Sequence, residues 1–119
     1  MSNVIRMIIL EQQISIEQLT AISVGLFGDM VKAVADVANN KLAIDAELHS
    51  DLERLLLENG SNQEDLWGLN LYPEMKGEDF IEFDSLINIR PRLNNRSRYV
   101  ESAEVRERIT EIVNSFIVR

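Results

Sequence analysis

The amino-acid sequence predicts a single α+β domain spanning residues 1–119, with a largely antiparallel sheet of about five strands and three helices. Three observations predict this class. The length of 119 residues suits one hydrophobic core. Short segments of alternating polarity occur in pairs around turn residues, which is typical of hairpins. Three segments with helix-start signals separate these strands, so the expected order is β-α-β-β-α-β-β-α.

The first strand and the first helix are predicted before residue 29. Residues 4–10 are apolar and rich in β-branched side chains, a composition typical of a partly buried strand. Ser15 and Gln18 match the S-x-x-Q capping box, which begins a helix by satisfying its first free N–H groups. Gly28 then predicts the end of that helix, because glycine adopts left-handed backbone angles without steric cost.

Residues 30–49 predict a hairpin around a two-residue turn at Asn39 and Asn40, because asparagine tolerates a positive φ. This register places Lys32 across from Glu47 on one face. A slip by one residue would move every apolar side chain to the other face. On the opposite face the register aligns four apolar pairs, namely Val37 with Leu42, Ala35 with Ile44, Ala33 with Ala46, and Val31 with Leu48.

The second half of the chain predicts two helices that flank a second hairpin. Ser50 and Glu53 match a capping box, and Gly60 predicts the end of this helix. The last helix begins at Ser102 and carries apolar residues at steps of three and four. Between these helices, a hairpin with its turn at 73–79 places one set of apolar residues on a common face. That set is Trp67, Leu69, Leu71, Ile81, Phe83, Ile87 and Ile89.

Composition and charge exclude several classes of function. With 20 acidic and 12 basic residues the net charge is −8, which argues against nucleic acid and anionic membranes as partners. No apolar stretch approaches the roughly 20 residues of a membrane-spanning helix. The absence of cysteine excludes disulfides and thiol chemistry and favours a cytoplasmic location. No phosphate-binding loop, nucleophile elbow or zinc-protease motif is present.

Asp45, Glu47 and His49 form the first candidate site. On a continuous strand these alternate residues share one face at spacings of about 6 to 7 Å. Two carboxylates and an imidazole suit Mn²⁺, Fe²⁺ or Zn²⁺. The alternative is that Glu47 pairs with Lys32 and that the carboxylates between residues 45 and 85 only keep the protein soluble.

Glu82 and Asp84 form a second candidate, because two neighbouring carboxylates can have separated pKa values and supply a catalytic acid and base. The alternative is that Asn70 hydrogen-bonds Glu82 across the strands while Asp84 pairs with an arginine of the following loop.

The loop after the second hairpin carries four arginines and no acid, which suits bidentate binding of a phosphate or another anion. The alternative partner of this loop is the acidic surface of the chain itself or of a second subunit. The four arginines are Arg90, Arg92, Arg96 and Arg98.

Leu66, Tyr72, Phe80 and Leu86 are expected on the face of the second hairpin opposite the main core. Three helices need not cover both faces of a sheet, and uncovered apolar area marks an interface with a protein partner or another copy. The leading hypothesis is therefore a non-enzymatic soluble binding or assembly protein without a cofactor. The alternative is a small metal-dependent enzyme, or a divalent-cation-binding protein, that uses an acidic face of the sheet.

Four stretches carry a resemblance to a known family: residues 27–37, 47–73, 81–91 and 95–98. Together they resemble a small family of uncharacterised prokaryotic proteins, a domain of unknown function. The resemblance spans nearly the whole chain and is most specific in residues 47–73. It implies a stand-alone, single-domain prokaryotic protein and no activity, ligand or catalytic residue.

Overall fold

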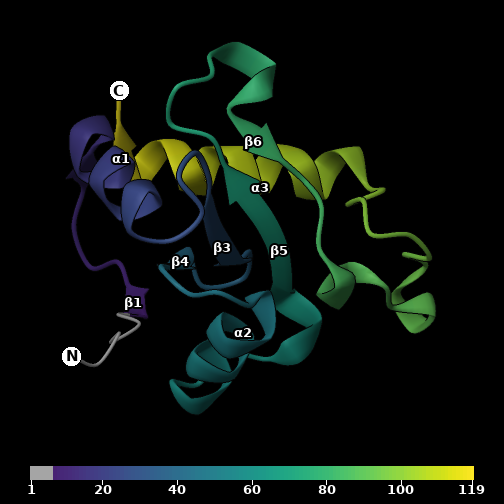
Figure 1. Ribbon diagram of the computed structural model, residues 1–119. Helices are drawn as coiled ribbons and strands as arrows, with labels where there is room; N and C mark the ends of the chain where they lie inside the picture. Colours follow the sequence, from purple (N-terminus) through teal and green to yellow (C-terminus); the bar gives the residue numbers. More distant parts are fainter. Residues whose placement is uncertain (1–6) are drawn as a thin grey trace.

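The computed structural model describes residues 7–119 and contains a five-stranded antiparallel sheet in the order β1-β4-β3-β5-β6 (Figure 1). The predicted α+β class, with three helices beside such a sheet, is confirmed. Residues 4–6 of the first predicted strand lie outside the described part of the chain, and Ile8–Ile9 of that segment form a strand. The strands are β1 (Ile8–Ile9), β3 (Val31–Asp36), β4 (Lys41–Ile44), β5 (Leu66–Leu71) and β6 (Ile81–Glu82).

Helices cover both faces of the sheet. One face packs against α1 (Ile16–Gly25) and α3 (Ala103–Phe116), and we call it the α1/α3 face. The other packs against α2 (His49–Glu58), and we call it the α2 face. Alternate residues of the strands supply the two cores. The larger core includes Val31, Ala33, Leu42, Ile44, Leu69, Leu71, Leu19, Ile109 and Val113, and the smaller includes Val34, Ala43, Leu66, Leu52 and Leu56.

The first hairpin has its strands in a register shifted by two residues from the predicted one. Ala35 pairs with Leu42, and Val37–Asn40 form the connection instead of a two-residue turn. The Asp36 carboxylate accepts hydrogen bonds from the N–H groups of Ala38 and Asn39, both at 3.0 Å, and so begins the turn early. Because a shift of two preserves the alternation, the predicted assignment of apolar residues to faces survives.

Helix α2 begins at His49 with Leu48 at the N-cap position, so the predicted capping box of Ser50 and Glu53 is wrong. The N-cap residue offers this helix no side-chain hydrogen bond. Its other end follows the prediction: Gly60 has a φ of +98°, and its N–H bonds the oxygen of Leu57 at 3.2 Å. This left-handed glycine ends the helix in a Schellman-type turn.

Helices α1 and α3 begin where the sequence predicts. The Ser15 hydroxyl accepts from the N–H of Gln18, whose side chain accepts from the N–H of Ser15, which completes the capping box. The Ser102 hydroxyl accepts from the N–H of Val105 at the start of α3. A parallel pair of short strands, β2 (Ile14–Ser15) and β7 (Ile117–Val118), was not predicted. It joins the segment before α1 to the segment after α3.

The second hairpin has the predicted register, with Leu71 opposite Ile81, but β6 ends after two residues. The predicted strand to Ile89 is wrong, because residues 86–88 form a 3₁₀ turn and Ile89 is exposed. The Asn88 side chain replaces the missing strand: it accepts from the N–H of Gly68 at 2.8 Å and donates to its carbonyl at 2.9 Å. A Cβ on Gly68 would lie 2.5 Å from Ser85, so only glycine fits there.

Within residues 7–119, no helix has both the length and the apolar character that crossing a membrane requires.

Candidate functional site

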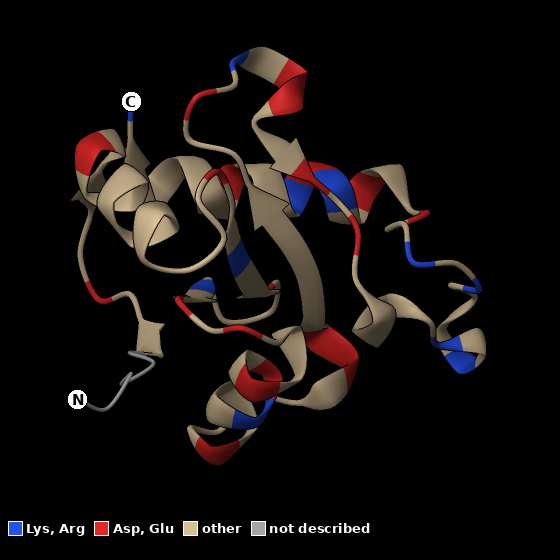
Figure 2. Ribbon diagram, in the orientation of Figure 1, with Lys and Arg blue, Asp and Glu red and all other residues tan. Residues whose placement is uncertain are grey.

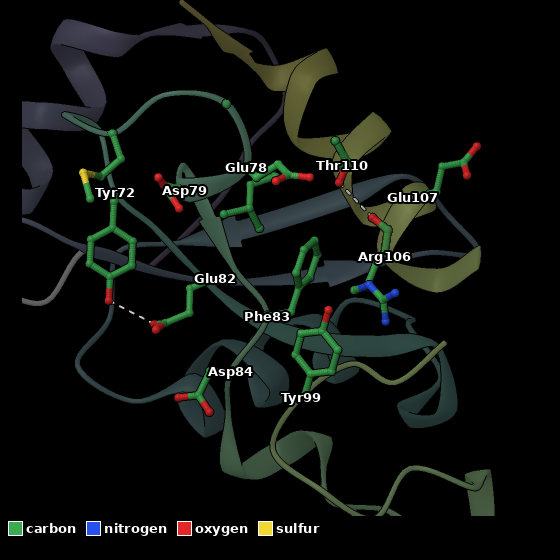
Figure 3. A pocket seen from close by; sticks show the side chains of 13 residues that line it. Tyr72, Glu78, Asp79, Glu82, Phe83, Asp84, Tyr99, Arg106, Glu107 and Thr110 are labelled. Atoms are coloured by element: carbon green, nitrogen blue, oxygen red, sulfur yellow. Dashed lines mark hydrogen bonds between the residues drawn. The ribbon is translucent and has the colours of Figure 1, made fainter. Parts of the chain in front are cut away.

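A groove of about 1130 Å³ runs along β6, and we call it the β6 groove (Figure 3). The segment from Tyr72 to Asp84 supplies one wall. Tyr99 and three residues of α3, Arg106, Glu107 and Thr110, supply the other. The groove therefore combines the exposed edge of the sheet with one side of the last helix.

Aromatic side chains form the apolar part of this groove. The rings of Phe83 and Tyr99 meet edge to face, with centroids 6.4 Å apart. The guanidinium of Arg106 lies 4.9 Å from the centre of the Tyr99 ring and donates to the carbonyl of Val100 at 2.7 Å. Arg106 is thus fixed against the wall, while the Phe83–Tyr99 pair offers an apolar surface for the stem of a ligand.

The polar lining of the groove is dominated by carboxylates, and among the described residues Arg106 is its one basic member. Within the described residues, Glu78, Asp79 and Glu107 take part in no ion pair, and all three are exposed. Such a concentration of carboxylates produces a negative potential that favours cations. The five acidic residues of the lining are Glu78, Asp79, Glu82, Asp84 and Glu107.

Glu82 is held in place by two donors. The side-chain amide of Asn70 donates to its carboxylate at 2.8 Å, and the hydroxyl of Tyr72 donates to the same oxygen at 3.0 Å. Burial raises the pKa of Tyr72 to about 12, and the hydrogen bond and charge of Glu82 act in the same direction. The predicted hydrogen bond between Asn70 and Glu82 is confirmed.

Asp84 is held by Arg98, whose Nε and Nη2 donate to the two carboxylate oxygens at 2.9 and 2.8 Å. This pair confirms the predicted contact between Asp84 and an arginine of the following loop. The hydrogen bond to Asp84, and then its charge, raise the pKa of Arg98. Glu82 and Asp84 therefore bind separate donors. This is the arrangement that the sequence indicated as the alternative to a catalytic acid and base.

His49 is the first residue of α2, and its exposed fraction is 8%. Its Nε2 lies 2.8 Å from the carbonyl of Leu69, which can only accept, so Nε2 carries a proton. Burial lowers the pKa of His49, the bond to Leu69 opposes this, and the charge of Lys32 lowers it further. The side chain of the neighbouring Asn70, whose Oδ1 is buried, acts on the pKa of His49 in the same direction as the bond to Leu69.

The three predicted metal ligands do not share a strand face. Strand β4 ends at Ile44, and Asp45 follows with a φ of +76°, which interrupts the extended backbone. Glu47 is exposed, whereas His49 belongs to α2 and is directed at Leu69. Across residues 7–119, no three histidine, aspartate or glutamate side chains are grouped so as to hold a metal ion. The predicted position of Glu47 directly across from Lys32 is also wrong, because β4 ends at Ile44, before Glu47. On its other side, β3 pairs Lys32 with Asn70 of β5.

The four loop arginines do not converge. Arg90 donates to the carbonyls of Ile87 at 2.8 Å and Gln63 at 2.6 Å, and also to that of Leu66. Its guanidinium lies 4.9 Å from the centre of the Trp67 ring, and burial lowers its pKa. Arg98 binds Asp84, while Arg92 and Arg96 are exposed. The four guanidiniums therefore do not form one cluster in this structure.

A family model for proteins of unknown function, DUF5674, matches residues 8–116. The chain belongs to the DUF5674 family. No curated protein and no solved structure matches it.

The DUF5674 chain does not expose the predicted interface as one surface. Leu66 and Phe80 are fully buried, because α2 covers Leu66 and the turn at 77–79 directs Phe80 into the larger core. Tyr72 is half-buried and binds Glu82. Only Leu86, at 66% exposure, is as exposed as predicted.

Sequence reasoning missed the contribution of α3 to the groove of this DUF5674 protein. Arg106 and Thr110 each follow a core residue of the helix, Val105 and Ile109, and so stand at the border of its buried stripe. This periodicity identifies border positions. It does not show that they lie opposite β6, because that juxtaposition depends on the packing of the whole fold.

Proposed function

We propose that this DUF5674 protein is a non-enzymatic binding protein that holds a cationic ligand in the β6 groove. The observation that carries the proposal is the arrangement of five carboxylates around an aromatic surface at the open edge of the sheet. A lysine or arginine side chain of a protein partner fits this chemistry. Its aliphatic stem packs against the rings while its charged head reaches the carboxylates.

A binding role accounts for the side chains better than catalysis does. Two carboxylates of the groove, Glu82 and Asp84, are fixed by Asn70, Tyr72 and Arg98. His49 donates to a backbone carbonyl instead of facing a nucleophile. The proposal requires no cofactor. A cytoplasmic location and a prokaryotic source, both expected from the sequence, belong to the same proposal.

The test is binding of a short capped peptide of arginine, leucine and asparagine, compared with a peptide in which glutamate replaces arginine. We expect the basic peptide to bind, and its affinity to fall with added salt because exposed charges are screened beyond about 10 Å in 0.1 M salt. The double substitution E78Q/E107Q should weaken binding by about twofold to thirtyfold, since each exposed ion pair contributes about 0.2 to 1 kcal/mol.

The matched control is E17Q/E58Q, which removes two exposed glutamates from α1 and α2 and the same amount of charge. Equal binding of the acidic peptide, or equal weakening by both double substitutions, would contradict the proposal. Amide chemical shifts should change at Ile81 to Asp84 and not in α2.

A further inference from the structure

We propose that the cationic ligand of the β6 groove is the loop of residues 90–98 of a second copy of this chain. The inference rests on the proposed function and names its partner. It follows from the presence, on one molecule, of an acidic groove and a projecting basic loop that reaches that groove only through Arg98 at its end.

The middle of the loop presents two exposed positive charges. At one end of the loop, Arg90 donates to the carbonyls of Ile87 and Gln63. At the other end, Arg98 donates to the carboxylate of Asp84. Arg92 and Arg96 lie between them, exposed, and neither forms an ion pair within residues 7–119. Arg96 lies near Glu101, whose carboxylate accepts from the Arg96 backbone N–H at 2.9 Å. Figure 2 shows basic positions, in blue, along the loop at this end of the molecule.

Internal hydrogen bonds order the loop within a single molecule. The buried side chain of Asn95 donates to the carbonyls of Asn88 at 2.8 Å and Tyr99 at 2.8 Å, and accepts from the N–H of Glu101 at 2.8 Å. Residues 91–93 form a 3₁₀ turn. A segment that is already ordered loses little conformational entropy on docking, which favours association.

The loop also has apolar surface to match the groove. Leu93 follows Arg92 directly and is 38% exposed, and Ile89, immediately before the loop, is 43% exposed. In the groove, Met75 and Tyr99 are exposed at 49% and 47%. Contact between these surfaces would bury apolar area on both copies while Arg92 and Arg96 approach the free carboxylates of the groove wall.

The loop cannot fill the groove of its own molecule. Figure 1 places the 90–98 loop at one end of the molecule and the hairpin tip at 72–79, which carries Glu78 and Asp79 of the groove, well away from it. The pair between Arg98 and Asp84 holds the loop base beside the groove but leaves its tip pointing outward. Because each copy carries both parts, two copies can exchange loops about a two-fold axis and form a closed dimer.

The test is sedimentation equilibrium of the wild-type chain and of two charge-reversed variants, R92E and E78K. We expect a dimer whose dissociation constant rises about tenfold or more with either reversal, because attraction becomes repulsion in both contacts. The controls are R54E and E58K, which make the same changes of charge at exposed positions of α2. They should leave the dissociation constant nearly unchanged.

Mixing R92E with E78K provides a second measurement that does not depend on the stability of either variant alone. In the mixed dimer, the glutamate introduced at position 92 of one copy meets the lysine introduced at position 78 of the other, and the second contact keeps its natural pair. We therefore expect the mixture to form dimers with near wild-type affinity, whereas each variant alone dimerises about tenfold or more weakly.

The outcomes separate this inference from the proposed function. A monomeric wild-type chain that still binds the basic peptide in its groove overturns the loop exchange and leaves the binding role intact. A dimer that R92E and R54E weaken equally, or that the mixture does not restore, also overturns it. A monomer that binds no basic peptide contradicts both.

Discussion

Side-chain amides replace backbone pairing at several points in this protein. Asn88 binds both the N–H and the carbonyl of Gly68, and its amide also donates to the carbonyl of Arg98 at 3.0 Å. Asn95 binds three carbonyls of the surrounding segment. An amide carries one acceptor and two donors in a plane, so it can satisfy a strand edge where no strand is present. The irregular segment 85–101 is ordered for this reason.

His49 is the residue whose charge is most sensitive to conditions near neutrality. Burial, assisted by the charge of Lys32, holds its pKa below the ordinary value despite the bond to Leu69. As the pH falls through about 6.5, the unfolded chain binds a proton before the folded chain does. We therefore expect the free energy of unfolding to fall between about pH 7 and the lowered pKa, and then to level off.

Urea unfolding across this pH range checks the prediction, with His49→Gln as the comparison. Glutamine offers an N–H donor to Leu69 and does not titrate, so its stability should change little over the same interval. A wild-type protein that is equally stable across the range would show that His49 has an ordinary pKa in the folded chain.

The helices and strands were predictable wherever a local signal determined them. Three local signals were sufficient: the capping box of Ser15 and Gln18, the glycine that ends α2, and the apolar stripe along α3. The errors arose where a side chain bonded a distant or unexpected backbone group. Asp36 moved the first turn, and Asn88 replaced the end of the second hairpin. Residue type alone does not reveal such bonds.

Asp36 decides the register of the first hairpin, so its removal tests the element as a whole. The carboxylate is fully buried and accepts from Ala38 and Asn39, from the Asn39 amide at 2.9 Å and from the Ser61 hydroxyl at 2.6 Å. Burial alone would raise its pKa, but these bonds together lower it. We expect Asp36→Ala to reduce the free energy of unfolding by about 2 to 4 kcal/mol.

The pH dependence gives an independent check on this role. With a lowered pKa, Asp36 contributes stability that is complete above the ordinary value of about 3.9 and is lost as the pH falls through the lower folded value. The difference between wild type and Asp36→Ala in chemical unfolding should therefore shrink in acid. Asp79→Ala, at an exposed position, should cost little at any pH, and an equal loss in both variants would refute the assignment.

At the scale of the molecule, the candidate site could be predicted only in pieces. The contacts of Glu82 with Asn70 and of Asp84 with the arginine loop followed from neighbouring strands and a short connection. The opposing wall follows from neither, because the position of Tyr99 and α3 opposite β6 depends on the packing of the larger core. The predicted grouping of metal ligands assumed a continuous strand through Asp45. The left-handed backbone at Asp45 interrupts that strand, so the three side chains do not share a face.

The pairing of β2 with β7 also depends on the whole molecule, because these strands lie far apart in the sequence. Strand β7 follows α3 directly and pairs in parallel with β2, which precedes α1. Ile117 is 3% exposed within the larger core, whereas its neighbour Val118 is 49% exposed. The helices that cover the α1/α3 face are thereby joined at their ends, so we expect them to unfold together.

Ile117→Ala should lower the free energy of unfolding by about 2 to 5 kcal/mol, because it leaves a cavity in that core. Val118→Ala should change it by less than about 0.5 kcal/mol, since the side chain is half exposed. Urea denaturation followed by circular dichroism and by Trp67 fluorescence measures both variants and should give coincident, single transitions. Equal stabilities of the two variants, or a separate early transition in wild type, would mean that the terminal pairing does not hold these layers together.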